Sequence, residues 1–434
     1  MVSYSLKLSL RSVIISPVLS LVTLVLLGIG VAGAMTLITE ICKISGDPIP
    51  SRSRMLYYPL VDPRDSTEIA KSKEPPDQLT WTDAQALLAN APAEQKAIMT
   101  GGQVTIMPAD GKKHFFFATA RYTTAGFARL FNVPLRGGAW WTTSDDSDHA
   151  RVVVISKVLA EKVFGTDSVV GRTIRTTGTD FRVVGVLDTW QPRPKFYDVG
   201  PGAYDSVEDI FIPFATSREL KLTTSGSVSC WGNDVDLGAS LEQLPCAWIQ
   251  MWVALSTPLE VQRFKDYLFA YSKNQAQLGR FQSHATYRLY SLNAWLEHEN
   301  VVPDDPKVQL IISLGLLLAC VTNASALFLV KCVKRAPELA VRRALGAPRR
   351  SIFLQLMMEA IALGVIGSVI ATLLLPVGVW LLRQQPDSFA QHVSTDVTVY
   401  ATTIALAIFS MSLSALFPSF YACRVPPARV IKLQ

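Results

Sequence analysis

The stretch KCVKRAPELAVRRALGAPRRSI, from Lys331 to Ile352, places seven basic residues and a single acid, Glu338, between two of the most apolar segments of the chain. One hypothesis for such a cluster is a phosphate-binding surface for nucleic acid. The flanking segments favour another interpretation, because short basic loops beside apolar runs are typical of the cytoplasmic side of membrane spans. We therefore expect this segment to lie beside membrane lipid, and we expect no nucleic-acid partner.

Four apolar blocks contain almost no charge in a chain of 434 residues that is 49% hydrophobic and only 18% charged. Each exceeds the roughly 20 residues that a helix needs to cross a bilayer core. The blocks are PVLSLVTLVLLGIGVAGAMTLIT before Glu40, Val308–Val330, Ala360–Leu382 and Val397–Cys423. The sequence therefore predicts an integral membrane protein with four spans.

Positive charge lies at three places along this pattern and predicts the orientation of the spans. Lys7 and Arg11 precede the first block, and the seven basic residues lie between the second and third. Arg424, Arg429 and Lys432 follow the fourth. Because cytoplasmic flanks collect Lys and Arg, both termini and the basic segment are expected inside the cell.

The predicted fold is four transmembrane α-helices with a large α+β periplasmic domain inserted between helices 1 and 2. An alternative for the N-terminus is a cleaved secretory signal, because Ala32-Gly33-Ala34 fits a small-residue cleavage site. The predicted boundaries are a cytoplasmic N-terminus at 1–16, helix 1 at 17–41, the periplasmic domain at 42–305, helix 2 at 306–332, a cytoplasmic coupling segment at 333–350, helix 3 at 351–383, a short periplasmic loop at 384–396, helix 4 at 397–422 and a cytoplasmic tail at 423–434.

The segment between the first two spans combines strand and helix patterns. Residues 46–80 are rich in Pro, Asp and Ser and are interpreted as an extended entry strand or a linker. Strands are predicted for the runs QVTIM, KHFFFATARYT, ARVVVIS, RTIRTTG, DFRVVGVLD and WIQMWVA. Helices are predicted for TWTDAQALLANAP, KVLAEKVFG and LEVQRFKDYLFAYSKNQAQ, the second ended by its glycine.

The cysteines agree with this topology. Cys230 and Cys246 both fall in the predicted outer domain, where an oxidising compartment permits a disulfide between them. Cys42, just outside the first span, is a possible competing partner, and two unpaired thiols are the other alternative. The remaining cysteines lie in or at the inner side of spans and are expected to stay reduced.

No motif in the sequence indicates catalysis, a metal site or a cofactor. The nearest approach to a phosphate loop, GTDSVVGRT from Gly165, has the wrong glycine spacing and an arginine in place of the lysine. The five histidines show no HExxH spacing and no pairing with cysteine. Glu359 directly precedes the third apolar block, within predicted helix 3, and as an interfacial acid it is expected to pair with Arg349 or Arg350 rather than to serve ion transport.

Several stretches resemble the FtsX-like and MacB-like ABC transporter permeases. The segment PELAVRRALGAPRRSIFLQLMMEAIALGVIGSVIA, Pro337–Ala371, is similar to the signature of these permeases, and PSFYACRVPPARVIKLQ is similar to their C-terminus. The first span resembles theirs as well. The stretch from Phe131 to Asp188 is similar to the MacB-like periplasmic core domain. Pro337 departs from the family, which usually has a polar residue there.

The resemblance implies that the basic segment is a coupling helix that docks on an ATPase. The residues that match it are Glu338, Leu339, Arg342, Arg343, Ala344, Leu345, Gly346 and Ala347. Only about 16 residues precede the first span here, so the ATPase is expected to be a separate subunit that holds the ATP and Mg²⁺. The alternative is that the basic residues of this segment only determine the orientation of the spans and bind no partner.

The resemblance also implies partners and a location. The expected membrane partner is a second copy of the chain or a sister permease. The MacB-like mechanism adds a periplasmic adaptor and an outer-membrane duct as partners. The expected location is the bacterial inner membrane. Three functions fit this plan: export of antibiotics, peptides or lipopeptides, release of lipoproteins by a Lol-type permease, and FtsX-like activation of cell-wall hydrolases. The size of the outer segment favours export.

The orientation can be tested by cysteine labelling in intact spheroplasts. A reagent that cannot cross the membrane should modify a cysteine placed by Ser147→Cys, because this position is predicted outside, and not one placed by Ser351→Cys. The unsubstituted chain is the control for labelling of native cysteines. Equal labelling at both positions would contradict the predicted orientation.

Overall fold

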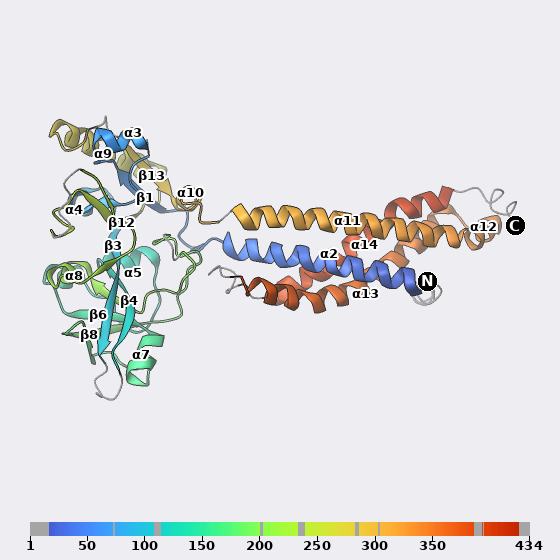
Figure 1. Cartoon of the computed structure of the whole chain (residues 1–434), viewed down its shortest axis with the longest axis horizontal. Coiled ribbons are helices and arrows are strands. Elements are labelled where there is room, and N and C mark those ends of the chain that lie inside the picture. Colours follow the sequence, from blue (N-terminus) through green and yellow to red (C-terminus); the bar gives the residue numbers. More distant parts are fainter. Residues whose placement is uncertain are drawn as a thin grey trace. The chain divides into compact units, whose positions relative to one another are not determined.

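The computed structural model describes residues 17–72, 74–107, 114–199, 203–232, 239–282, 286–302, 304–385, 393 and 395–424. Two compact units are present: a helical unit, Met1–Gly46 with Val302–Gln434, and an α+β unit, Asp47–Val301 (Figure 1). The predicted N-terminus at 1–16 and the basic tail residues Arg429 and Lys432 lie outside the described residues.

The helical unit contains four helices that are long and apolar enough to cross a membrane. In chain order the α+β unit lies between the first and the second of them, as predicted. A short helix, α12, connects the second to the third. The bounds are α2 (Pro17–Ile44), α11 (Asp304–Lys334), α12 (Ala336–Ala344), α13 (Arg349–Leu382) and α14 (Val397–Arg424).

Close helix packing in this unit depends on small residues. Helix α13 packs along α14 and α2, and α11 packs along α2 and α14. A Cβ added at Gly28 would lie 2.7 Å from Cγ2 of Ile370, and one added at Gly364 would lie 2.9 Å from Cα of Ile408. Since lipid tails are as apolar as the side chains, such close contacts rather than water exclusion hold membrane helices together.

One mixed sheet organises the α+β unit. The strand order is β13-β1-β12-β3-β4-β9-β6-β8-β5, and the pairs β4/β9 and β6/β8 are parallel while the others along this path are antiparallel. These strands are β1 (Leu56–Val61), β3 (Gln95–Met107), β4 (Phe116–Thr123), β5 (Leu135–Gly138), β6 (Val152–Ser156), β8 (Thr179–Leu187), β9 (Ile210–Pro213), β12 (Cys246–Ala254) and β13 (Tyr287–Ser291). The short strands β2 (Leu79–Thr80), β7 (Thr173–Thr176), β10 (Thr224–Ser225) and β11 (Ser229–Cys230) pair at its sides.

Both faces of the sheet carry a hydrophobic core. On β12, Met251 and Val253 belong to one core and Trp252 to the other, as expected when successive side chains point to opposite faces. Helices cover both faces for this reason. Helices α4 (Trp81–Asn90), α7 (Lys157–Phe164), α8 (Phe214–Glu219) and α9 (Pro258–Gln277) contribute to the first core, and α5 (Gly126–Phe131) and α10 (Leu292–His298) to the second.

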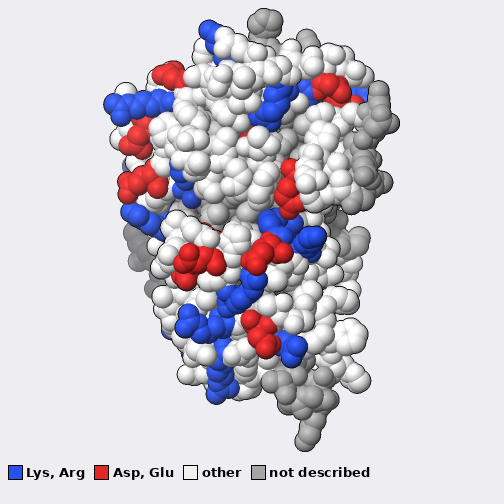
Figure 2. Space-filling model, turned by 90° about the vertical axis from the view of Figure 1, so that its left-hand side faces the viewer, with Lys and Arg blue, Asp and Glu red and all other residues white. Residues whose placement is uncertain are grey.

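Local sequence signals explain where these helices begin and end. The hydroxyls of Thr80, Ser156 and Thr257 accept hydrogen bonds from backbone N–H groups at the starts of α4, α7 and α9. Gly165 ends α7 in the left-handed region, with a φ of +72°. The predicted helices and strands of this segment are confirmed. Of the two alternatives for residues 46–80, the entry strand is confirmed, because β1 lies inside the sheet between β12 and β13. Acidic and basic side chains are interspersed on the face shown in Figure 2.

Candidate functional site

The basic segment folds into helix α12, whose charges follow the helix dipole. Pro337 lies in the first turn, where its missing N–H removes no hydrogen bond, and Glu338 lies in the same turn. Arg342 and Arg343 lie in the last turn. An acid near the N-terminus and cations near the C-terminus both stabilise a helix. Gly346 follows with a φ of +97°, a conformation that favours glycine.

The two faces of α12 differ in exposure. Leu339 and Ala340 are buried against the helical unit, whereas Val341 is 53% exposed and Leu345 is 84% exposed. Residues three and four apart share one helix face. The exposed residues on this spacing form what is called here the apolar docking face: Pro337, Val341, Ala344 and Leu345. An exposed apolar helix face in a charged segment is typical of a protein interaction site.

The charged residues of the segment form ion pairs within the chain. Glu338 contacts Arg342 at 2.7 Å and Arg335 at 3.3 Å. Arg342 also donates a hydrogen bond to the side chain of Gln355 on α13, at 3.0 Å. Arg342 thus anchors α12 to α13, so it serves the segment's own structure as well as any partner.

Arg343 has a different environment from its neighbour. Its side chain is half-buried and lines a small cavity of about 30 Å³ together with Cys332 of α11 and Tyr421 and Ala422 of α14. Ala347, the last of the predicted coupling residues, is half-buried. The segment therefore contacts α11, α13 and α14 through side chains other than those of its docking face.

Glu359 is buried at the same end of the helical unit. Its carboxylate oxygens contact Nζ of Lys331 at 2.8 Å and Nη1 of Arg335 at 2.7 Å. The expected pairing with Arg349 or Arg350 named the wrong cations, because Lys331 at the end of α11 and Arg335 just after it face the carboxylate on α13. Lys331 also reaches the hydroxyl of Ser20 on α2, at 3.4 Å.

These contacts form a continuous polar network from α12 into the membrane helices. Arg335 joins Glu338 of α12 to Glu359 of α13, and Lys331 joins Glu359 to α11 and α2. Buried charges in an apolar setting are stable only while each is paired. The network therefore connects α12 with three of the four long helices, α11, α13 and α2, at one end of the helical unit.

The α+β unit contains a large cleft of about 930 Å³. Its lining combines aromatic rings with charges of both signs. They include Trp81, Trp141 and Phe214 as rings, Lys96, Arg129 and Arg218 as cations, and Glu94, Asp146 and Glu219 as acids. A cleft of this volume and mixed lining is typical of sites for small organic molecules.

Asp146 is the titratable group of the cleft with the most altered acidity. Burial raises its pKa from 3.8 to about 6, although its carboxylate accepts hydrogen bonds from the backbone N–H of Ala125 and from Nε1 of Trp141. The adjacent Asp145 caps α6 (Thr143–Ser147), and the hydrogen bonds from Thr142 lower its pKa. Two neighbouring carboxylates thus have opposite shifts.

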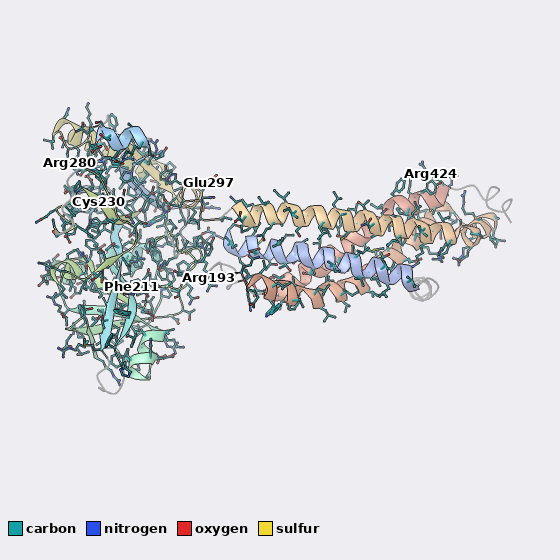
Figure 3. The ribbon with its side chains drawn as sticks, in the orientation of Figure 1. Arg193, Phe211, Cys230, Arg280, Glu297 and Arg424 are labelled. Atoms are coloured by element: carbon teal, nitrogen blue, oxygen red, sulfur yellow. A yellow bond between two sulfur atoms is a disulfide. The ribbon has the colours of Figure 1, made fainter. Side chains whose placement is uncertain are left out.

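The cysteines of the α+β unit stabilise it covalently. Cys230 and Cys246 form a disulfide that joins β11 to β12, and Figure 3 labels Cys230 in this unit. A bridge across 16 residues contributes about 3 kcal/mol in the chain-entropy model. Cys42 is an exposed free thiol, and Cys320, Cys332 and Cys423 are buried and free.

Two clusters in the α+β unit have no local sequence signal. Arg121 on β4 is buried and pairs with Glu208 and Asp198. Burial of Glu208 raises the pKa of its carboxyl, but the nearby charges of Arg121 and Lys195 outweigh this effect and lower the pKa to about 2. The other cluster is Asp77 with His298 and Glu299, whose ligand atoms lie close together. Arg121 is far along the chain from the acids that it contacts, and Asp77 is far from His298 and Glu299. Spacing patterns in the sequence therefore do not reveal either cluster.

Two family profiles together match most of the chain. The profile of the MacB-like periplasmic core domain matches residues 18–268, and that of the FtsX-like permease C-terminal matches residues 310–427. The chain is a MacB-like ABC transporter permease. Its α12 lies within the FtsX-like part, and its cleft lies within the MacB-like part.

Curated relatives of this MacB-like permease are distant. They include the macrolide export ATP-binding/permease protein MacB of Wolinella succinogenes, 22% identical over 65% of this chain and 40% of that protein, and MacB of Rhodopirellula baltica, 28% identical over 54% and 34%. The pyoverdine export ATP-binding/permease protein PvdT of Pseudomonas entomophila is 22% identical over 83% and 50%. The chain spans half or less of the length of these relatives.

Solved structures similar to this chain include a periplasmic region and an extracellular domain. The periplasmic region of MacB from Actinobacillus actinomycetemcomitans is 12% identical and covers 58% of this chain and 96% of its own, with a TM-score of 0.36. The extracellular domain of the transporter YknZ from Gram-positive bacteria is 14% identical and covers 54% and 99%, with a TM-score of 0.35.

The substitution Glu359→Gln should destabilise the helical unit, because it removes the carboxylate that pairs with Lys331 and one of the carboxylates that pair with Arg335, which still contacts Glu338. Removing one member of a buried ion pair costs about 3–5 kcal/mol. The midpoint of thermal unfolding of the full chain in detergent micelles should fall well below that of the unsubstituted protein. Glu338→Gln is the control, because Glu338 is 43% exposed and surface pairs contribute about 0–1 kcal/mol. Equal midpoints for the two variants would contradict the structural role of Glu359.

The shifted pKa of Asp146 predicts a pH dependence of stability. Since the folded pKa of about 6 exceeds the ordinary 3.8, its contribution is complete below pH 3.8 and is lost as the pH rises through about 6. The unfolding midpoint should therefore gain less in Asp146→Asn than in the unsubstituted protein when the pH falls from about 7.5 to about 5.

Asp145→Asn is the matched control, because the lowered pKa of Asp145 has the opposite sign: its contribution is present above pH 3.8 and is lost as the pH falls further. If Asp146→Asn leaves the pH profile of the midpoint unchanged, Asp146 is ionised throughout and the assigned burial effect is wrong.

Proposed function

We propose that the chain is the permease subunit of an ABC export system in the bacterial inner membrane, driven by a separate ATPase subunit. The observation that carries the proposal is helix α12, which exposes an apolar face while ion pairs connect it to the membrane helices. A segment built for topology alone needs positive charge only. It does not need Val341 and Leu345 exposed on one face.

The occupant of the apolar docking face is the ABC ATPase. The relatives MacB and PvdT have names that join ATP-binding with permease. In this proposal ATP and Mg²⁺ bind in that ATPase, and the chain supplies the surface on which it docks. Apolar residues surrounded by arginine are well suited to a stable interface, because apolar contacts supply the affinity and charges supply orientation and rate.

Movement of α12 is transmitted through the polar network to the membrane helices. Arg335 and Lys331 connect α12 to α13, α11 and α2. Helices α2 and α11 continue along the chain into the two ends of the α+β unit. A change in their relative position at the inner end is therefore passed to both ends of that unit. This is the mechanical coupling that expels cargo without carrying it between the spans.

The cleft of the α+β unit is the site that meets the cargo. Its volume of about 930 Å³ suits organic molecules of the size of antibiotics or short peptides. Aromatic rings such as Trp81 and Trp141 supply apolar contact, while Arg218 and Glu219 supply orientation. A second permease copy or a sister permease completes the membrane part, and a periplasmic adaptor and an outer-membrane duct receive the cargo.

The double substitution Val341→Asp with Leu345→Asp tests the docking face. It should lower co-purification of the ATPase about tenfold or more, because desolvated apolar contacts at an interface are replaced by charge. Membrane insertion should persist, since Leu339 and Ala340 still pack and all seven basic residues remain. Pull-down from membranes and ATP hydrolysis by the reconstituted pair are the measurements.

The control is Ser3→Asp with Ser5→Asp, which adds the same two charges in the predicted cytoplasmic N-terminus. Reversal of Arg342 and Arg343 to Glu is a less specific test, because Arg342 also holds Glu338 and Gln355. If the Asp variant binds the ATPase normally, α12 does not dock through this face. If the unsubstituted protein binds a cell-wall hydrolase or a lipoprotein carrier in place of exporting cargo, the export function is wrong.

A further inference from the structure

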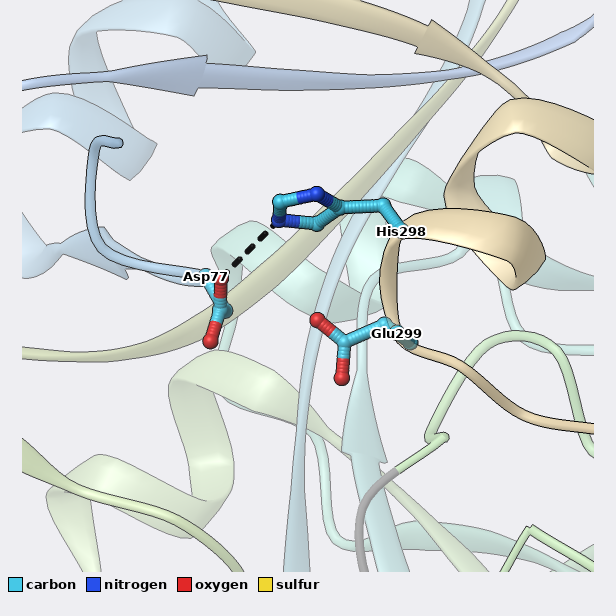
Figure 4. Close-up of side chains that lie close together, drawn as sticks. All are labelled: Asp77, His298 and Glu299. Atoms are coloured by element: carbon cyan, nitrogen blue, oxygen red, sulfur yellow. Dashed lines mark ion pairs between the residues drawn. The ribbon is translucent and has the colours of Figure 1, made fainter. Parts of the chain in front are cut away.

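Three potential metal ligands meet in the α+β unit (Figure 4). Asp77 precedes β2, His298 is the last residue of α10, and Glu299 caps that helix. Nε2 of His298 lies 3.6 Å from Oδ1 of Asp77, and one ligand atom from each of the three residues lies within 4.8 Å of the others. Among the described residues, no lysine or arginine forms an ion pair with either carboxylate.

The neighbours of the cluster fix its geometry. Tyr58 donates a hydrogen bond from its hydroxyl to the backbone oxygen of Asp77, at 2.7 Å. The ring of His298 stacks on that of Tyr290, with centroids 4.8 Å apart. The backbone of Asp77 and the ring plane of His298 are therefore held in place, while the carboxylate of Asp77 remains 61% exposed and free to adjust.

A buried acceptor faces the same space. Asp77, Glu299 and Gln250 together line a cavity of about 140 Å³. Gln250 is only 6% exposed, and its Oε1 has no hydrogen-bond donor among the described residues. Its Nε2 lies 3.5 Å from Oδ1 of Asp198, so the amide oxygen is the group left without a partner. Burying an acceptor without a donor is costly, and water bound to a cation is a strong donor.

We infer that Asp77, His298 and Glu299 bind one divalent transition-metal ion, and that a water on this ion donates to Gln250. One imidazole and two carboxylates are ligands that suit Zn²⁺ and similar ions. Ca²⁺ and Mg²⁺ prefer oxygen ligands alone. In a tetrahedral site, ligands at about 2.0–2.2 Å from Zn²⁺ lie about 3.3–3.6 Å apart, so ligand atoms that are up to 4.8 Å apart have to approach by about 1 Å, which rotation of the exposed Asp77 side chain permits.

The ion would join two distant parts of the chain. It ties the segment before β2 to the end of α10, which is the last element before helix α11. The site thus stabilises the end of the α+β unit at the point where the chain leaves it. The inference does not depend on the export function, because it concerns binding by these side chains alone.

Titration calorimetry of the full chain in detergent micelles tests the site. The protein is stripped with chelator and its free thiols, including the exposed Cys42, are alkylated so that they cannot bind metal. Zn²⁺ should bind at one ion per chain. Asp77→Asn and His298→Ala should each weaken its binding at least about tenfold. His149→Ala is the matched control, because His149 is an exposed histidine beside Glu219, at 3.0 Å, where Arg151 already neutralises the carboxylate.

A second readout needs no variant. Zn²⁺ should protect His298 from diethyl pyrocarbonate, as seen by mass spectrometry, while His149 continues to react, and Ca²⁺ should protect neither. Equal Zn²⁺ affinity in the His298→Ala and His149→Ala variants, or modification of His298 unaffected by Zn²⁺, would overturn the inference. Protection of His298, but not of His149, by tetramethylammonium and not by Zn²⁺ would assign the cavity to organic cations and overturn the inference as well.

Discussion

The burial of one carboxylate between two cations organises the inner end of the helical unit. Glu359 lies in an apolar bundle where an unpaired charge would be strongly destabilising, so Lys331 and Arg335 have to remain beside it. This requirement fixes the rotation of α11 relative to α13. It also fixes where α12 begins, because Arg335 immediately precedes that helix and bonds to Glu338 within it. Removing the acid would release all three elements together.

The orientation of α12 follows from this anchoring. With Arg335 and Arg342 tied to α13, Leu339 and Ala340 have to face the bundle, and the opposite face has to be exposed. The exposed residues of that face are mostly apolar, with Glu338 as a charged neighbour of Val341. A stable helix in water would gain nothing from them, which is why a protein partner gives the best account of the arrangement.

The α+β unit meets a different constraint, because its sheet is buried on both faces. Strand β12 has no exposed residue, and its alternate side chains enter two separate cores. A sheet of this kind transmits displacement as a stiff body, since neither face can slide over water. Along the chain, this unit follows α2 and precedes α11, so a long apolar helix adjoins each of its two ends.

Local patterns in the sequence were sufficient for the plan of the protein. The length of the apolar blocks predicted four membrane helices, and the positions of Lys and Arg predicted their orientation. Runs rich in β-branched residues predicted strands such as β6 and β8, because such runs are properties of short segments. The signature around Glu338 pointed to the family. For residues 46–80 the sequence left an entry strand and a linker as alternatives, because Pro59 and the polar surroundings weaken the strand signal. The pairing of β1 with β12 and β13 decided for the strand.

Only the tertiary structure decided which side chains meet. Glu359 has two arginines close to it in sequence, at 349 and 350, yet it pairs with Lys331 and Arg335, because the packing of α11 against α13 sets the neighbours of a buried group. The same holds for Asp77 with His298 and for Arg121 with Glu208, which lie on elements far apart in the chain. A sequence determines period and hydrophobicity locally, whereas contacts between elements depend on how all of them pack at once.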